Sequence, residues 1–137
     1  MTCKVCTGEW PAKDYKISEL GLSVAYLHED QFFPGWTVLV LKRHATELFD
    51  LTREERSQLI EEVTEVARTL AVVFDAVKIN YELFGNKVPH IHWHIIPRLA
   101  DDPDPRETVW AVKHDRRRLK PALLSERISL IRSHLKI

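Results

Sequence analysis

Runs of apolar and polar positions predict two pairs of β-strands. In the first pair, the segments LSVAYLHED (22–30) and GWTVLVLKRH (35–44) are rich in β-branched and aromatic residues. The short segment QFFPG lies between them, so we expect a hairpin-like pair. A shorter strand around DYKISEL (14–20) is expected to precede this pair.

The second predicted pair comprises AVKINYEL (76–83) and VPHIHWHIIPR (88–98). A short turn over residues 84–87 separates the two runs, so they should pair antiparallel. Pro97 cannot donate a backbone hydrogen bond, and we expect the second strand to end there.

A long helix is predicted after residue 51. Thr52 can cap this helix, and Glu55, three residues later, can complete a capping box. Apolar residues then recur at helical spacing and form one stripe, which should cover a face of the sheet. The stripe consists of Leu59, Ile60, Val63, Val66, Ala67, Leu70 and Val73.

A second helix is predicted near the C-terminus, where Pro121 suits a first helical turn. Its apolar stripe consists of Leu124, Ile128, Ile131 and Leu135. Strands in hairpins, two helices and no βαβ alternation predict an α+β fold. We expect an antiparallel sheet of about five strands with a long covering helix and a C-terminal helix.

Composition indicates a single domain. The chain has 137 residues, of which 45% are apolar, and this suits one compact core. We expect the core of the domain over residues 14–99 and a C-terminal extension with the second helix over residues 100–137. The acidic, proline-rich segment DDPDPRE (101–107) is typical of a loop.

The charge balance bears on possible partners. The chain has 20 basic and 20 acidic residues, so no overall field draws it to nucleic acid or to a membrane surface. No apolar run approaches the roughly 18 residues of a membrane span, and the N-terminus lacks the apolar segment of a secretory signal. Cys3 and Cys6 lie too close together to be a disulfide framework. We expect a cytoplasmic protein with no nucleic-acid or membrane partner.

Three histidines alternate with apolar residues in VPHIHWHIIPR. Side chains alternate between the faces of a strand, so His90, His92 and His94 should share one face, roughly 6.5 to 7 Å apart per step. Ile91 and Trp93 should point to the other face, toward the long helix. The histidines could have no role, could bind a metal ion, or could attack phosphorus through a ring nitrogen.

The full pattern, His-Φ-His-Φ-His-Φ-Φ with Φ apolar, resembles the histidine triad (HIT) superfamily of nucleotide hydrolases and transferases. The resemblance extends from YLHEDQFFPGWTVLVLKRH through the long helix to IIPR. It implies that His92 attacks the α-phosphate of a nucleotide and forms a nucleotidyl-histidine that water then resolves. It also implies that His94 holds phosphate oxygens and that His90 orients His92. The chemistry would require no cofactor, and the protein would be a homodimer joined sheet to sheet.

Four further positions are matched to the family by the same resemblance. Asn80 would contact the phosphate or orient the nucleophile, and Asn86 would lie near the leaving group. His28 stands where relatives place a residue that binds the ribose. Trp36 is a departure, because many relatives have a further histidine there; a tryptophan could stack on a base or fill space.

The pair Cys3 and Cys6 has the Cys-x-x-Cys spacing that supplies two ligands of a structural zinc site. Some HIT relatives carry zinc on such a pair together with two histidines, which here would be His44 and His90. Zinc on His90 would leave His92 and His94 for catalysis. The alternative is that the two cysteines lie on a frayed N-terminus and bind nothing.

Two other functions remain open from the sequence. A metal-dependent enzyme that uses the triad as ligands would lose activity with chelators. A non-catalytic nucleotide-binding module would bind nucleotide tightly without turning it over. The intact His92 favours the nucleotide hydrolase or transferase, whose substrate could be a dinucleoside polyphosphate, a phosphoramidate or an adenylylated compound.

Overall fold

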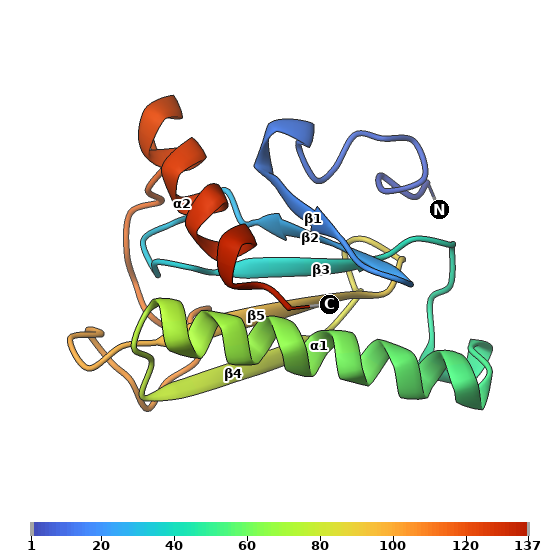
Figure 1. Ribbon diagram of the computed structural model, residues 1–137. Helices are drawn as coiled ribbons and strands as arrows, with labels where there is room; N and C mark the ends of the chain where they lie inside the picture. The colour runs from blue at the N-terminus through green and yellow to red at the C-terminus, as the bar shows by residue number, and fades with distance from the viewer. Residues whose placement is uncertain (1, 137) are drawn as a thin grey trace.

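A five-stranded antiparallel sheet forms the centre of the structure, a computed structural model that describes residues 2–136 (Figure 1). The spatial order of the strands is β1-β2-β3-β5-β4, so β5 lies inside the sheet and β4 at an edge. The strands are β1 (Lys16–Glu19), β2 (Ser23–Leu27), β3 (Thr37–Leu41), β4 (Lys78–Leu83) and β5 (His92–Arg98). Both predicted antiparallel pairs are confirmed, β2 with β3 and β4 with β5.

The two predicted helices are α1 (Arg53–Val73) and α2 (Pro121–His134). Two short 3-10 turns are also present: η1 (Lys13–Tyr15) before β1 and η2 (Leu48–Asp50) before α1. The capping box is present: the Glu55 N–H donates to Thr52 Oγ1, and the Thr52 N–H donates to Glu55 Oε1. The α+β fold is therefore confirmed. Within residues 2–136, no helix is long and apolar enough to cross a membrane.

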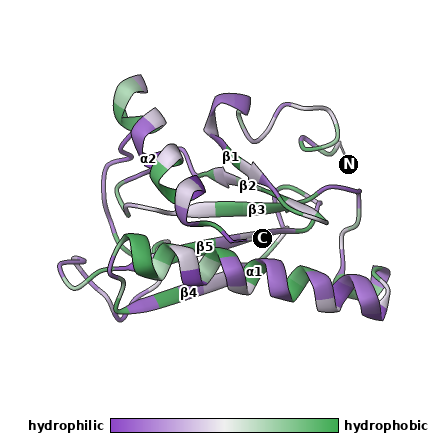
Figure 2. Cartoon of the chain, viewed as in Figure 1, coloured by the Kyte–Doolittle hydropathy of each residue, from purple (hydrophilic) through white to green (hydrophobic). Residues whose placement is uncertain are grey.

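Both helices lie on the same side of the sheet, where they cover its apolar face (Figure 1). Ile95 of β5 lies there in one hydrophobic core with Val63, Val66 and Leu70 of α1. Hydrophobic and hydrophilic positions alternate along α1 in Figure 2, as an amphipathic helix requires. The predicted stripe is wrong at Ile60, whose side chain is 47% exposed. Ile60 instead lines a surface hollow together with Leu48 and Trp93.

The strand predicted over residues 88–98 begins only at His92 and continues through Pro97 to Arg98. Before His92 the chain is held by other contacts: the Ile91 N–H donates to the carbonyl of Ala45, and the Leu41 N–H donates to the carbonyl of Ile91. Pairing with β3 ends at Ile95, so Pro97 lies beyond that ladder and is tolerated inside the strand. His90 therefore lies outside the strand that carries the other two histidines.

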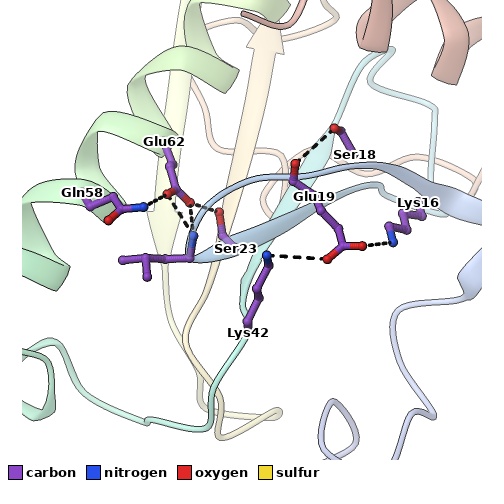
Figure 3. A network of polar contacts seen from close by, with 8 residues as sticks. Lys16, Ser18, Glu19, Ser23, Lys42, Gln58 and Glu62 are labelled. Atoms are coloured by element: carbon purple, nitrogen blue, oxygen red, sulfur yellow. Dashed lines mark hydrogen bonds and ion pairs between the residues drawn. The ribbon is translucent and has the colours of Figure 1, made fainter. Parts of the chain in front are cut away.

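Glu62 of α1 fastens the turn between β1 and β2 to the helix (Figure 3). Its buried carboxylate accepts from the Leu22 N–H, from the Ser23 hydroxyl at 2.6 Å and from the Gln58 amide at 3.0 Å. A buried carboxylate is costly unless hydrogen bonds compensate it, and here several donors do so. This contact fixes the helix over the strands that lead to the site.

Arg98, at the end of β5, organises the loop that follows it. The side chain is 1% exposed and forms a two-pronged ion pair with Asp102, with N···O distances of 2.7 and 3.0 Å. It also donates to the side-chain oxygen of Asn80 at 2.8 Å and to the carbonyls of Asp104 and Glu107. One guanidinium thus determines the path of the chain after β5.

Replacing Arg98 should destabilise the protein strongly. Arg98→Met leaves the Asp102 carboxylate buried without its partner, which costs about 3 to 5 kcal/mol of unfolding free energy. Arg118 pairs with Glu29 on the surface, so Arg118→Met should cost about 1 kcal/mol or less. Urea denaturation of both variants measures the difference. Equal losses in the two variants would contradict this role for Arg98.

Candidate active site

His92 is the first residue of β5, and its side chain is 5% exposed. Its Nδ1 lies 2.7 Å from the backbone carbonyl oxygen of His90. A carbonyl can only accept, so Nδ1 carries the proton and the lone pair of Nε2 is free. Burial lowers the pKa of His92, which keeps the ring neutral at neutral pH. The residue therefore has the tautomer and charge of a nitrogen nucleophile.

His94 lies beside His92 on the same face of the sheet, with ring centroids 5.3 Å apart. Its Nδ1 is 3.1 Å from the indole nitrogen of Trp36. Burial lowers the pKa of His94 to about 3, and the neighbouring rings of His28 and His92 contribute in the same direction. His94 is therefore uncharged at neutral pH.

A cavity of about 470 Å³ opens over these two histidines. Trp10 and Trp110 line the cavity, with ring centroids 5.1 Å from His92 and 5.3 Å from His94 respectively. The rest of the wall comes from the turn between β4 and β5: Phe84, Gly85, Asn86, Lys87 and Val88. The cavity thus combines aromatic walls, one cation and two imidazoles, and it could hold a planar base and a phosphate together.

The structure distributes the other predicted site residues over different places. Asn86 lines the cavity, as expected for a residue near a leaving group. His28 lies behind it, stacked on Trp36 with ring centroids 3.9 Å apart and 5.8 Å from His94. Asn80 lies further along β4, opposite Ile96, where its side-chain oxygen accepts from Arg98. It lines a separate hollow with residues 105–108.

Glu82 and Trp10 lie at the site but were not predicted from the sequence. Glu82 is paired with His94 across the β4–β5 ladder and accepts a hydrogen bond of 2.6 Å from the Trp110 indole. Burial raises the pKa of this carboxyl, while the Trp110 bond lowers it less. Glu82 was predictable, because antiparallel pairing across the short turn places it opposite His94. No periodic pattern marks Trp10.

The segment that carries Trp110 is fastened to the loop between β2 and β3. His114 Nε2 lies 2.8 Å from Asp30, and its Nδ1 lies 2.8 Å from the carbonyl of Val112. Burial opposes protonation of His114, but the bonds to Asp30 and Val112 raise its pKa above the ordinary value. The Arg117 N–H also donates to Asp30. These contacts hold Trp110 against the triad.

Four predicted metal ligands meet on the far side of His90. The ligand atoms of Cys3, Cys6, His44 and His90 all lie within 4.8 Å of one another. His90 Nε2 is 2.6 Å from the carbonyl of Leu41, so it carries the proton and leaves the Nδ1 lone pair directed at the cysteines. The Cys6 N–H donates to Cys3 Sγ, and such bonds lower the pKa of the Cys3 thiol although burial raises it.

Four of the six distances between ligand atoms in this cluster fit a tetrahedral zinc site closely, and the other two are no longer than 4.8 Å. With Zn–S of about 2.3 Å and Zn–N of about 2.05 Å, ligand atoms are about 3.3 to 3.8 Å apart. Here the two Nδ1 atoms of His44 and His90 are 3.2 Å apart. Cys6 Sγ to His44, Cys3 Sγ to His90 and Cys6 Sγ to His90 measure 3.3, 3.5 and 3.8 Å. The residues therefore fit a structural zinc ion.

Comparisons with known proteins agree with this fold. The chain matches the HIT domain family over residues 11–101, and it belongs to that family. "Protein hit" of Bacillus subtilis is 30% identical over 82% of this chain and 79% of its own length. The asymmetrical bis(5'-nucleosyl)-tetraphosphatase of Schizosaccharomyces pombe is 32% identical over 66% of this chain, which spans about half of that relative (52%).

Solved structures of histidine triad proteins have the same fold. A histidine triad protein of Bradyrhizobium japonicum has a TM-score of 0.81 and 31% identity, over 90% of this chain and 93% of its own. A second neighbour, from Mycobacterium smegmatis, is described as a zinc-bound histidine triad family protein. It has a TM-score of 0.71 and 25% identity over 98% of this chain and 94% of its own.

The neutral histidines of the site predict a loss of stability in acid. Burial lowers the pKa of His28 to about 4 and that of His94 to about 3. The pKa of a histidine in an unfolded chain is about 6.5. Between about pH 6.5 and 4 the unfolded chain takes up protons that the folded chain does not. The free energy of unfolding should therefore fall with decreasing pH, by up to about 1.4 kcal/mol per pH unit for each histidine.

Urea denaturation at several pH values measures this slope in the wild type and in His28→Phe. The phenylalanine keeps an aromatic ring on Trp36 and removes one titrating group, so the fall should be less steep in the variant. An identical slope in both proteins would show that His28 is not held neutral.

Proposed function

We propose that this protein is a nucleotide hydrolase or nucleotidyl transferase that acts at an α-phosphate, with His92 as the nucleophile. The observation that carries the proposal is the hydrogen bond from His92 Nδ1 to the carbonyl of His90, because it leaves the Nε2 lone pair free at the floor of the cavity. Family membership and the nucleotide chemistry in the name of the tetraphosphatase relative support the same chemistry.

The reaction proceeds in two displacements. His92 Nε2 forms a bond to the α-phosphorus while the bond from phosphorus to the leaving oxygen or nitrogen breaks, and the leaving group takes up a proton. Water, or an acceptor alcohol or amine in the case of transfer, then attacks the phosphorus on the opposite face. That step breaks the N–P bond, releases the nucleoside monophosphate or its derivative and restores His92.

Substrate would be held by residues that line the cavity. His94, Lys87 and Asn86 would contact phosphate oxygens or the leaving group, since their polar groups line the cavity beside His92. Trp10 and Trp110 would border the base or an apolar leaving group. The predicted contact of His28 with the ribose is not part of this proposal, because His28 stacks on Trp36 behind the cavity. Asn80 would act through Arg98 on the loop after β5.

The alternative in which the triad itself binds a catalytic metal is disfavoured by the directions of the rings. Both nitrogens of His90 are engaged away from the cavity, one with the carbonyl of Leu41 and the other facing Cys3 and His44. His94 Nδ1 is covered by the indole of Trp36. The three histidines therefore cannot each direct a ring nitrogen at one shared metal ion.

We also propose that Cys3, Cys6, His44 and His90 hold a structural zinc ion. Its chemistry would be to fasten the N-terminal turn and to fix the His90 ring, with no part in bond making. Four residues after Cys6, Trp10 reaches the cavity, so this fastening would also keep Trp10 beside His92.

The assembly and location are proposed on more general grounds. β4 is the edge strand of the sheet and exposes Tyr81, which is 50% accessible, so a second copy could pair there in a homodimer. Cys3 and Cys6 form no disulfide, which suits a reducing compartment such as the cytoplasm. Neither the homodimer nor the cellular location is part of the proposed reaction.

Replacing His92 should abolish turnover and the covalent intermediate. Wild-type protein mixed with a panel of dinucleoside tetraphosphates and nucleoside phosphoramidates should gain the mass of one nucleotide on the peptide that contains His92. His92→Gln should lose at least about a thousand-fold in turnover. As the control, His134→Gln changes an exposed residue at the end of α2 and should retain full turnover.

Full activity of His92→Gln on a substrate that the wild type turns over would contradict the proposal. Tight nucleotide binding by the wild type with no turnover of any substrate in the panel would instead support a non-catalytic binding module.

Metal removal should test the zinc proposal separately. Purified protein should contain about one zinc per chain by elemental analysis, and Cys3→Ser and His44→Asn should each lose it. Chelation should lower the melting temperature of the wild type, because the unfolded chain does not hold the assembled site. His134→Gln should keep its zinc. Metal-free wild type that melts at the same temperature with and without added zinc would contradict the proposal.

A further inference from the structure

Trp36 is fixed in one position beneath the cavity. Its side chain is 2% exposed, and the His28 ring stacks on its face at 3.9 Å with an interplanar angle of 5°. Phe33 and Trp110 pack edge-on at 6.3 and 5.2 Å. The strand register supports this placement, because Val38 is paired with His94 and Trp36 precedes Val38 by two residues on the same face. The indole therefore has little freedom to turn away from His94.

The bond between Trp36 and His94 has only one possible direction. An indole nitrogen donates and cannot accept, so His94 Nδ1 is the acceptor at 3.1 Å. A neutral imidazole has one N–H, and with Nδ1 accepting, that proton resides on Nε2. Since His94 lines the cavity and Trp36 covers Nδ1, Nε2 is the ring nitrogen that faces the cavity.

Protonating Nδ1 would place its N–H against the N–H of Trp36, which is repulsive. The titratable groups near His94 are the rings of His28 and His92, the carboxyl of Glu82 across the ladder on β4, and Lys87, which lines the same cavity. His28 accepts from the Asp30 N–H at Nδ1 and is neutral at neutral pH, as is His92. Glu82 is the one acidic group among these neighbours, and its carboxylate is already bound by the Trp110 indole.

We propose that Trp36 is a positioning residue that locks His94 as a neutral imidazole with its proton on Nε2, so that His94 meets the substrate as an uncharged hydrogen-bond donor. A histidine at position 36 could donate or accept and would permit either tautomer of His94, whereas a tryptophan permits one. The donor presented to a phosphate oxygen would then be the same between pH 5 and pH 8.

The tautomer itself follows from the geometry of the free protein, while its use toward a phosphate rests on the proposed function. A test on the free protein can therefore fail or succeed independently of turnover. If the tautomer is found and no nucleotide substrate is turned over, only the proposed function fails. If His92 is the nucleophile and the tautomer is wrong, only this inference fails.

Long-range ¹⁵N–¹H NMR of histidine-labelled protein reports the tautomer and charge of each ring. The wild type should show His94 as the Nε2–H tautomer with no titration between pH 5 and pH 8. In Trp36→Phe the aromatic packing is kept and the donor is lost. His94 should then populate the Nδ1–H tautomer as well, and its titration should move upward by about one pH unit or more.

Phe33→Leu is the matched control, because it disturbs the packing around Trp36 but leaves the indole N–H in place. Its His94 signals should resemble those of the wild type. An Nδ1–H or cationic His94 in the wild type at pH 6 would overturn the inference, and this result needs no variant. The same tautomer and the same titration in wild type and Trp36→Phe would overturn it as well.

Discussion

The hydrogen bond between His92 Nδ1 and the carbonyl of His90, at 2.7 Å, is the constraint on which the candidate site depends. It fixes the tautomer of the proposed nucleophile and directs its lone pair at the cavity. The carbonyl is itself held in place because His90 is anchored at both ring nitrogens, by Leu41 on one side and the cysteine cluster on the other. The N-terminal turn thus supports the position of His92 through a single residue.

Each of the three histidines is set by a different partner. His92 is oriented by a backbone carbonyl, His94 by the indole of Trp36, and His90 by Leu41 and the cysteine cluster. As a result, equal spacing in the sequence produces three unlike imidazoles. The same arrangement keeps the two rings in the cavity uncharged, which avoids repulsion between adjacent cations on one strand.

The fold was predictable from the sequence because its signals are local. Period-two alternation placed Trp93 and Ile95 toward α1 and His92 and His94 on the opposite face, and the capping box at Thr52 marked the start of α1. The triad pattern and the cysteine spacing identified the residues that the structure brings together. Other features depend on contacts between distant segments, which leave no periodic signal. His90 lies outside β5 because the chain just before His92 is bound to the loop at Ala45, through the Ile91 N–H and the Ala45 carbonyl.

Trp10 lies in an irregular segment before β1, and Trp110 lies in one after β5. Their shared position beside the histidines could therefore not be predicted from the sequence. The bond from Trp36 to His94 depends on the register of β3 against β5, which sequence spacing does not determine. The sequence marks Trp36 as unusual, but its donor role depends on where the fold places His94.

The stereochemical course at the α-phosphorus tests the central claim most directly. A substrate with a chiral α-phosphorothioate, turned over in ¹⁸O-labelled water, reports whether the configuration is kept or inverted. Attack by His92 followed by attack of water consists of two in-line displacements, so the account predicts net retention. Net inversion would mean that water attacks the phosphorus directly, and it would contradict a nucleotidyl-histidine intermediate.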